Sequence, residues 1–121
     1  MADPRSGIVA IIDDDAAILD SLKFLLEVFG HRVATYASAA AFLCESGPLP
    51  GCLILDHNMP GMTGLELAAQ LRQDGVVIPV LLITGAPSPA VVARAATLGV
   101  VRVLEKPADE ADLLDFIGRH C

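Results

Sequence analysis

Three aspartates stand in a row directly after an apolar stretch near the start of the chain. The segment VAIIDDD, residues 9–15, places Asp13, Asp14 and Asp15 where a buried strand is expected to end. Neighbouring carboxylates repel one another and cannot all stay ionised without a countercharge. Mg²⁺ prefers oxygen ligands and is usually held by one or two protein carboxylates together with waters and a phosphate oxygen. Asp13 and Asp14 are therefore predicted to bind Mg²⁺, and Asp15 to begin the following helix as its N-cap.

Polar residues also end or follow three later apolar stretches. Asp56 closes CLILD, Thr84 closes VLLIT, and Lys106 follows VVRVLE. An aspartate can act as a nucleophile and form an aspartyl phosphate. Phosphoryl transfer further needs positive charge and hydrogen-bond donors around the equatorial oxygens, which a metal ion, an ammonium and a hydroxyl can supply. If these strand ends meet in the fold, the set predicts phosphoryl transfer to Asp56.

Short apolar runs alternate with amphipathic stretches along the chain. The runs are rich in Val, Ile and Leu, as expected for strands covered on both faces. They lie at residues 7–12, 31–37, 52–56, 76–84 and 100–105. Helical patterns lie at residues 16–29, 38–45, from 63 onward, 88–99 and 109–119. The first helix is predicted to bury a stripe made of Ile18, Leu22, Leu25 and Phe29.

Cap residues support two of these helices. Thr63 and Glu66 have the spacing of a capping box. Ser88 is expected to be an N-cap, with Pro89 at the first helical position. Helix starts are therefore predicted directly after two of the apolar runs.

Strands that alternate with helices run parallel and are joined by right-handed crossovers. The chain is therefore predicted to be an α/β protein, a (βα)5 doubly wound five-stranded parallel sheet of flavodoxin-like type with strand order 2-1-3-4-5. Its 121 residues are expected to form one domain, residues 1–121, with a core over residues 7–119 and no output domain. Ligands of such sheets bind beyond the carboxyl ends of the strands, where the polar residues above would gather.

Charge and composition narrow the function. A formal net charge of −7 argues against direct nucleic acid binding, which needs basic patches. No apolar stretch is long enough to suggest a membrane span. Cys44, Cys52 and Cys121 lack metal-binding or CxxC spacing. We predict two of them in or near the core and one free terminal thiol, consistent with a reducing cytoplasm.

Four motifs, in order along the chain, carry a family resemblance. They are IIDDD, LILDHNMPGMTGLEL, LLITG and LEKP, and the intervals between Asp14, Asp56, Thr84 and Lys106 match those of the family. The chain resembles the receiver domain of two-component response regulators over essentially its whole length. The MPGMTGLEL segment is most similar to receivers of nitrogen-fixation-type transcriptional regulators.

The resemblance assigns a role to each position. It makes Asp56 the phosphoacceptor, and Asp13 and Asp14 the acidic pair that holds Mg²⁺ together with Asp56. Asn58 matches the position whose backbone carbonyl completes the metal coordination. Thr84 matches the switch hydroxyl that turns toward the phosphoryl group.

The resemblance also concerns the segment after the fifth strand. Lys106 matches the lysine that pairs with the phosphoryl group, and its bond to Pro107 is expected to be cis. The family commonly has Tyr or Phe three residues before this lysine, where this chain has Val103. A switch based on rotation of an aromatic ring therefore cannot operate at that position.

The implied function is that of a phosphorylation switch and not of a classical enzyme. A sensor histidine kinase or a phosphotransfer protein would donate the phosphoryl group to Asp56. The domain would catalyse its own phosphotransfer and a slow autodephosphorylation. The face formed by the helix at 88–99, the fifth strand and the last helix would then change its affinity for a downstream protein. The domain would be a monomer or a phosphorylation-dependent dimer.

Three alternatives stay open. The chain could be the receiver fragment of a longer DNA-binding response regulator or of a hybrid kinase. It could be a small aspartyl-phosphate phosphatase, because DDDAA formally contains a DxD motif, although the usual hydrophobic-Thr-Gly continuation is missing. A flavodoxin-type flavin carrier would need Ser, Thr or Gly after the first strand to hold phosphate, where three aspartates would repel it.

Overall fold

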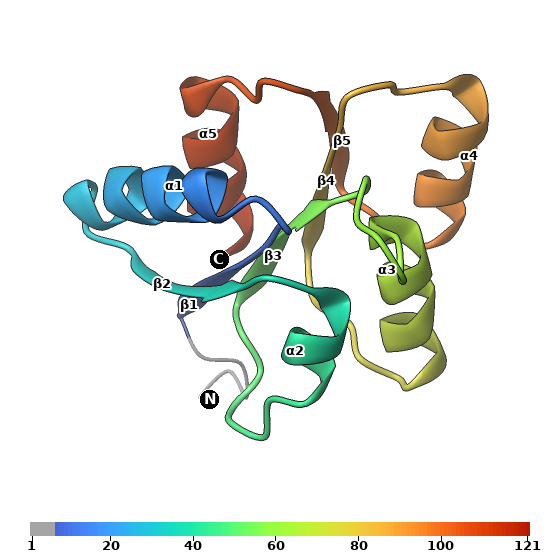
Figure 1. Cartoon of the computed structure of the whole chain (residues 1–121), viewed down its shortest axis with the longest axis horizontal. Helices are drawn as coiled ribbons and strands as arrows, with labels where there is room; N and C mark the ends of the chain where they lie inside the picture. The colour runs from blue at the N-terminus through green and yellow to red at the C-terminus, as the bar shows by residue number, and fades with distance from the viewer. Residues whose placement is uncertain (1–6) are drawn as a thin grey trace.

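Strands and helices alternate along the chain in the computed structural model, which describes residues 7–121 (Figure 1). The strands of this part of the chain are β1 (Ile8–Ile12), β2 (Arg32–Tyr36), β3 (Cys52–Asp56), β4 (Val80–Thr84) and β5 (Arg102–Glu105). Its helices are α1 (Ala16–Val28), α2 (Ala39–Leu43), α3 (Gly64–Gln73), α4 (Pro89–Thr97) and α5 (Glu110–His120). Every strand falls inside a predicted apolar run. The first six residues of the predicted domain lie outside the described residues.

The strands form one parallel sheet in the order β2-β1-β3-β4-β5. Its two central strands, β3 and β4, are buried along their whole length. Near-continuous apolar sequence is what a strand covered on both faces requires. The predicted fold class and strand order are confirmed.

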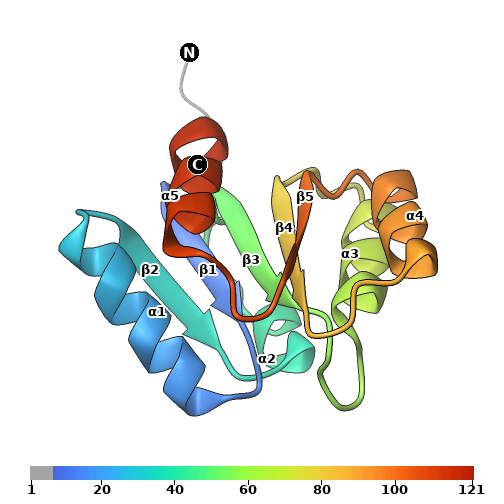
Figure 2. The ribbon, with the colours of Figure 1, turned by 90° about the horizontal axis from the view of Figure 1, so that it is seen from above.

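Alternate residues of each strand feed two separate cores. Leu53 and Leu55 of β3 point toward α2, α3 and α4, whereas Cys52 and Ile54 point toward α1 and α5. Figure 2 shows the sheet with α1 and α5 on one face and α3 on the other. The sheet is thus a central layer that is packed on both faces. Residues that bind ligands or react are therefore expected in the loops at its carboxyl edge.

The predicted caps set the starts of the helices at that edge. Asp15 accepts hydrogen bonds from the backbone of Ala17 and Ile18 at 2.9 and 3.3 Å, and so begins α1. The Thr63 hydroxyl and the Glu66 carboxylate form both halves of the capping box at α3. α1 therefore starts four positions after the end of β1, and α3 eight positions after the end of β3.

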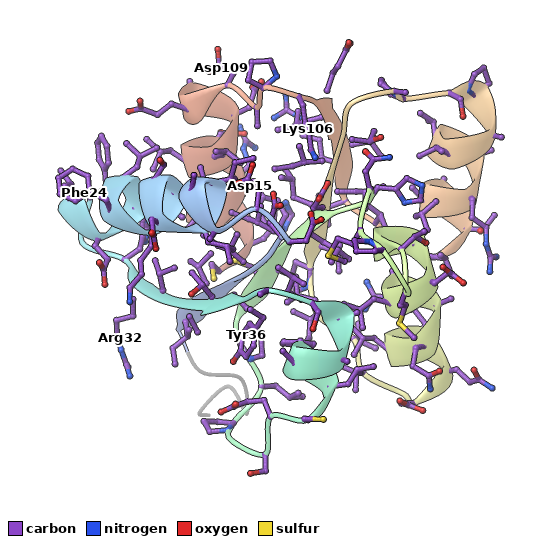
Figure 3. All side chains as sticks on the ribbon, viewed as in Figure 1. Asp15, Phe24, Arg32, Tyr36, Lys106 and Asp109 are labelled. Atoms are coloured by element: carbon purple, nitrogen blue, oxygen red, sulfur yellow. The ribbon has the colours of Figure 1, made fainter. Side chains whose placement is uncertain are left out.

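The predicted stripe of α1 is wrong in part. The fully buried side chains are Leu19 and Leu26, whereas Phe29 is 53% exposed. Apolar residues surround most of this helix, so more than one stripe of helical period fits the sequence. Packing against the sheet and α5 selects the stripe through Leu19 and Leu26. Phe24 consequently points from α1 into solvent (Figure 3).

The cysteine prediction also needs a correction. Cys52 is buried, but Cys44 is exposed along with Cys121. Cys44 is the C-cap of α2, one position beyond a five-residue helix that turns Ala39 and Phe42 toward the core. One cysteine rather than two therefore lies in the core.

The segment after β5 has the expected backbone. The peptide bond between Lys106 and Pro107 is cis, as the family resemblance implies. Val103 is half-buried in β5 and packs against the core under α2, α3 and α4. Within residues 7–121, none of the helices has the length and apolar character needed to cross a membrane.

Candidate functional site

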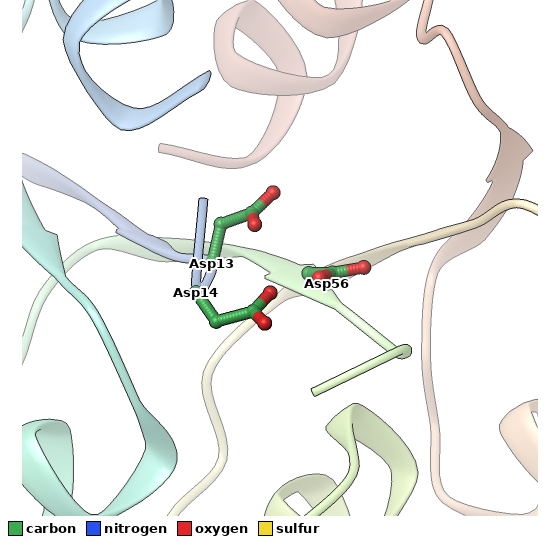
Figure 4. A group of neighbouring side chains, drawn as sticks. All are labelled: Asp13, Asp14 and Asp56. Atoms are coloured by element: carbon green, nitrogen blue, oxygen red, sulfur yellow. The ribbon is translucent and has the colours of Figure 1, made fainter. Parts of the chain in front are cut away.

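Three carboxylates meet at the carboxyl edge of the sheet. Asp13, Asp14 and Asp56 each place one oxygen so that these atoms lie within 4.8 Å of one another (Figure 4). Asp13 and Asp56 are only 6% and 2% exposed, whereas Asp14 is exposed. The structure therefore brings together the acidic residues that the sequence predicts as metal ligands.

The register of the sheet explains this meeting. β1 and β3 are neighbours, and Ile12 pairs with Leu55, so the next residues of the two strands, Asp13 and Asp56, lie side by side. The backbone N–H of Asp15 donates to Asp13 Oδ1 at 2.9 Å, and the backbone N–H of Asn58 donates to Asp56 Oδ1 at 3.2 Å. Both carboxylates are held in place by the loops that follow their strands.

The site has the electrostatics of a cation site. Burial raises the pKa of Asp13 from its usual value near 3.8 to about 6, the hydrogen bond from the Asp15 N–H opposes the rise, and the charge of Asp56 adds to it. Asp56 Oδ2 is buried and has no hydrogen-bond partner among the described residues. A buried carboxylate oxygen without a partner is rare and points to a missing ion or ligand group. A set of hard oxygen donors with this deficit of positive charge fits Mg²⁺.

Among residues 7–121, Lys106 supplies the one positive charge in direct contact with this cluster. Its Nζ lies 2.7 Å from Asp56 Oδ1, and its backbone N–H donates to the carbonyl of Thr84 at 2.9 Å. Partial burial alone would lower the pKa of the ammonium, but the hydrogen bond to Asp56 and the surrounding acidic charges raise it above its usual value. Lys106 therefore stays charged, and it leaves the second oxygen of Asp56 unpaired.

The Thr84 hydroxyl lies at the end of β4 and is buried. It donates to Asn58 Oδ1 at 3.2 Å and accepts from the backbone N–H of Ala86 at 3.2 Å. Asn58 Oδ1 also accepts the backbone N–H of Gly85 at 3.1 Å. Asn58 thus contacts both the Asp56 carboxylate and the loop after β4.

Two contributions to the site were not predicted from the sequence. The first is the contact of the Asn58 side chain with the Thr84 hydroxyl and the Gly85 N–H, which the sequence does not indicate. The second is Gly64: a Cβ placed there would lie 2.6 Å from the carbonyl oxygen of Asp56 and 2.9 Å from Cα of His57. Only glycine lets α3 begin this close to Asp56. A glycine directly after the Thr63 cap is the signal that could have indicated such a contact.

A largely apolar groove opens beside the cluster. It runs between α1 and the segment after β5, and its walls include Ile18, Leu22, Pro107 and Ala108. Asp13 and Lys106 stand at its polar end. The site can therefore be reached from solvent along the side that α1 borders.

The sequence that carries these groups matches a family model. The family model for the response regulator receiver domain matches residues 9–118. The chain is a member of that family. Transcriptional regulatory protein FixJ of Azorhizobium caulinodans is 43% identical over 112 residues, which are 92% of this chain and 53% of that protein. Response regulator protein TmoT of Ectopseudomonas mendocina is 39% identical over 93% of this chain and 52% of its own length.

Solved receiver structures have the same fold. The crystal structure of FixJ-N superimposes with a TM-score of 0.84 and 33% identity, covering 98% of this chain and 94% of that one. Chemotaxis protein CheY4 of Vibrio cholerae gives a TM-score of 0.85 with 27% identity, over 94% of this chain and 98% of that chain. The chain spans about half the length of the sequence relatives named above. It is a receiver domain of two-component response regulators, a class of signalling switches and not of classical enzymes.

Proposed function

We propose that Asp56 is the residue that receives the phosphoryl group. The observation that carries this proposal is the state of its carboxylate, which is 2% exposed with Oδ1 paired to Lys106 and Oδ2 without a partner among the described residues. Oδ2 is therefore the oxygen free to attack, and Lys106 fixes the carboxylate for that attack.

The proposed transfer forms a bond between phosphorus and Asp56 Oδ2. In the same step the bond from phosphorus to the donor breaks, and the electron pair leaves with the donor, an imidazole nitrogen of a phosphohistidine or the carboxylate of acetyl phosphate. Lys106 holds positive charge beside the transferred group. The Thr84 hydroxyl can donate a hydrogen bond to one of its oxygens after it turns. In this way the receiver promotes its own phosphorylation, and the slow hydrolysis that resets it uses the same groups.

Asp13, Asp14 and Asp56, together with the backbone carbonyl of Asn58, are proposed to hold Mg²⁺. The metal supplies charge neutralisation for the transferred phosphoryl oxygens when it is bound. The 4.8 Å cluster of carboxylate oxygens supports the acidic part of this set. The Asn58 carbonyl rests on the family resemblance.

Labelling with acetyl phosphate tests this function. We expect intact-mass spectra to show one added phosphoryl group on the wild-type chain with Mg²⁺, and none on Asp56→Asn or without the metal. Asp20→Asn is a matched control, because Asp20 is an exposed aspartate of α1 outside the cluster. Equal labelling of Asp56→Asn and the wild type would place the phosphoacceptor elsewhere.

The donor and the output follow from the family as proposals. A sensor histidine kinase or a phosphotransfer protein is the proposed donor, in the cytoplasm, and no direct contact with nucleic acid is proposed for this domain. The α4-β5-α5 face is the proposed output surface, acting as a monomer or through a phosphorylation-dependent dimer. Thr84 leads directly into the loop before α4, and Val92 and Val101 are exposed on that side. With Val103 in place of an aromatic ring, the signal would pass through Thr84 and this loop.

A second context is favoured by the length of the relatives. Regulators such as FixJ and TmoT are about twice as long as this chain. We therefore keep, beside a stand-alone receiver of residues 1–121, the proposal that the domain serves as the receiver of a longer DNA-binding regulator. Sequencing the transcript that encodes the chain, together with phosphotransfer from a panel of kinases, separates the two.

A further inference from the structure

The single proton of the Thr84 hydroxyl is already donated in the structure. A hydroxyl has one proton to donate, and Thr84 donates it to Asn58 Oδ1 at 3.2 Å. The same oxygen atom of Thr84 accepts the backbone N–H of Ala86 at 3.2 Å. A hydrogen bond from Thr84 to any new acceptor on Asp56 therefore requires that the bond to Asn58 break first.

The orientation of the Asn58 amide is fixed by its partners. The backbone N–H of Gly85 can only donate, and it lies 3.1 Å from Asn58 Oδ1. The oxygen and not the nitrogen of the amide must therefore face the loop after β4. A single acceptor atom consequently holds two donors of that loop, the hydroxyl of Thr84 and the N–H of Gly85.

The opposite side of Asn58 is tied to the phosphoacceptor. Its backbone N–H donates to Asp56 Oδ1 at 3.2 Å, two residues back along the chain. The backbone of Asn58 thus follows the carboxylate, while its side chain reaches across to β4. Asn58 is exposed, so its side chain is free of the packing constraints that hold the buried residues of β3.

We propose that the Asn58 side chain is a latch that holds the Thr84 hydroxyl away from Asp56 and so sets how readily the receiver switches. This inference rests on the proposed phosphorylation of Asp56, whose new oxygens would compete with Asn58 for the Thr84 proton. A neutral hydrogen bond of this kind corresponds to roughly a three- to tenfold factor in an equilibrium constant. Asn58 is a positioning residue here, because it acts through Thr84.

The test uses beryllofluoride as a phosphoryl mimic, at saturating Mg²⁺, with binding measured by calorimetry. We expect Asn58→Ala to lower the dissociation constant about three- to tenfold, because the bound mimic no longer competes with the latch. Asn58→Leu fills a similar volume without an acceptor and is expected to do the same. Both variants keep the backbone carbonyl proposed for the metal. Thermal melting checks that they fold.

A double-mutant cycle tests whether Asn58 acts through Thr84. In the Thr84→Ala background the latch has lost its main donor, so Asn58→Ala is expected to change the dissociation constant less than it does with Thr84 present. An equal change in both backgrounds, or no change in either, would overturn the proposal. Thr84→Ser keeps the hydroxyl and is expected to keep the coupling.

A spectroscopic measurement on the metal-free protein is independent of phosphorylation. We expect the NMR amide signal of Gly85 to shift upfield in Asn58→Ala, and the wild-type position to be largely kept in Asn58→Asp, which retains an acceptor oxygen. An unchanged Gly85 signal in Asn58→Ala would rule out the latch. Failure of acetyl phosphate to label the wild-type chain would instead refute the proposed function, so the two failures can be told apart.

Discussion

The two ends of the parallel sheet treat charge in opposite ways. At the amino end, the guanidinium of Arg72 donates to four backbone carbonyls. Those of Leu98, Val76 and Ile78 lie at 2.8, 3.0 and 2.9 Å, and that of Gly99 lies at 3.5 Å. These carbonyls belong to the loops before β4 and β5, so one cation ties two loops to α3. At the carboxyl end, three carboxylates share a single contacting cation in the described part of the chain, Lys106.

The difference separates stability from function. The backbone carbonyls around Arg72 already accept hydrogen bonds from its guanidinium, and a ligand would have to displace that guanidinium to bind them. The carboxylates at the other end keep an unpartnered oxygen and hydrogen bonds that can be traded for those of a ligand. We infer that the amino end stabilises the fold, and that the carboxyl end is less stable than it could be because it is ready to bind.

The largest effect is expected for Gly64→Ala. The added methyl group would meet the carbonyl oxygen of Asp56 at 2.6 Å, and backbone atoms cannot move aside cheaply. We expect a loss of about 3 kcal/mol in the free energy of unfolding, measured by urea denaturation, together with slower labelling by acetyl phosphate. Gly118→Ala is the control, because Gly118 lies in α5 with open space around it and should gain about 0.5 kcal/mol. An unchanged free energy of unfolding in Gly64→Ala would mean that the carboxyl end of the sheet has room to accept a methyl group, and would contradict its close packing.

Arg72→Met is expected to have the next largest effect. It keeps much of the apolar stem but leaves four carbonyls without this donor, which should cost about 2 kcal/mol in urea denaturation. Labelling of Asp56 by acetyl phosphate should keep its rate, because the site lies at the other end of the sheet. Arg94→Met is a control on α4. Within the described residues the Arg94 guanidinium hydrogen-bonds to Thr97 alone, so this substitution should change the free energy of unfolding by no more than about 0.5 kcal/mol. A large loss of labelling in Arg72→Met would contradict the division between the two ends.

The smallest expected effect is a pH dependence of the metal-free protein. The pKa of Asp13 is about 6 in the folded state and near 3.8 when unfolded, so between these values the folded state binds more protons. This contribution to stability is complete below about pH 4 and is lost as the pH rises through 6. We expect the free energy of unfolding of the wild type to fall, relative to Asp13→Asn, by about 1 kcal/mol between pH 5 and 7.5. If the free energies of unfolding of the wild type and Asp13→Asn changed equally with pH, burial would not raise the pKa of Asp13.

The strands and the acidic cluster could be predicted because they depend on local pattern and on topology alone. Continuous Val, Ile and Leu runs indicate strands buried on both faces, and parallel topology brings their polar ends together. The proximity of Asp13 and Asp56 therefore follows directly from the predicted strand order, which the structure confirms.

Other details depend on contacts that no sequence pattern encodes. Leu19 and Phe29 are both apolar, so the sequence does not tell which of them is buried. Packing of α1 against its neighbours buries Leu19 and leaves Phe29 exposed. The role of the Asn58 amide depends on the distance across to β4, and that of Gly64 on how closely α3 approaches β3. Such cross-chain distances are set only when the whole fold is assembled.

The close contact between Gly64 and the carbonyl of Asp56 couples Asp56 mechanically to the first turn of α3. A Cβ does not fit between them, so a displacement of this turn is passed on to Asp56. A binder designed against the exposed side of α3, which includes Glu66, is therefore expected to shift the proposed phosphoacceptor without entering its pocket. Inhibition of that kind would not be relieved by raising the concentration of the phosphoryl donor.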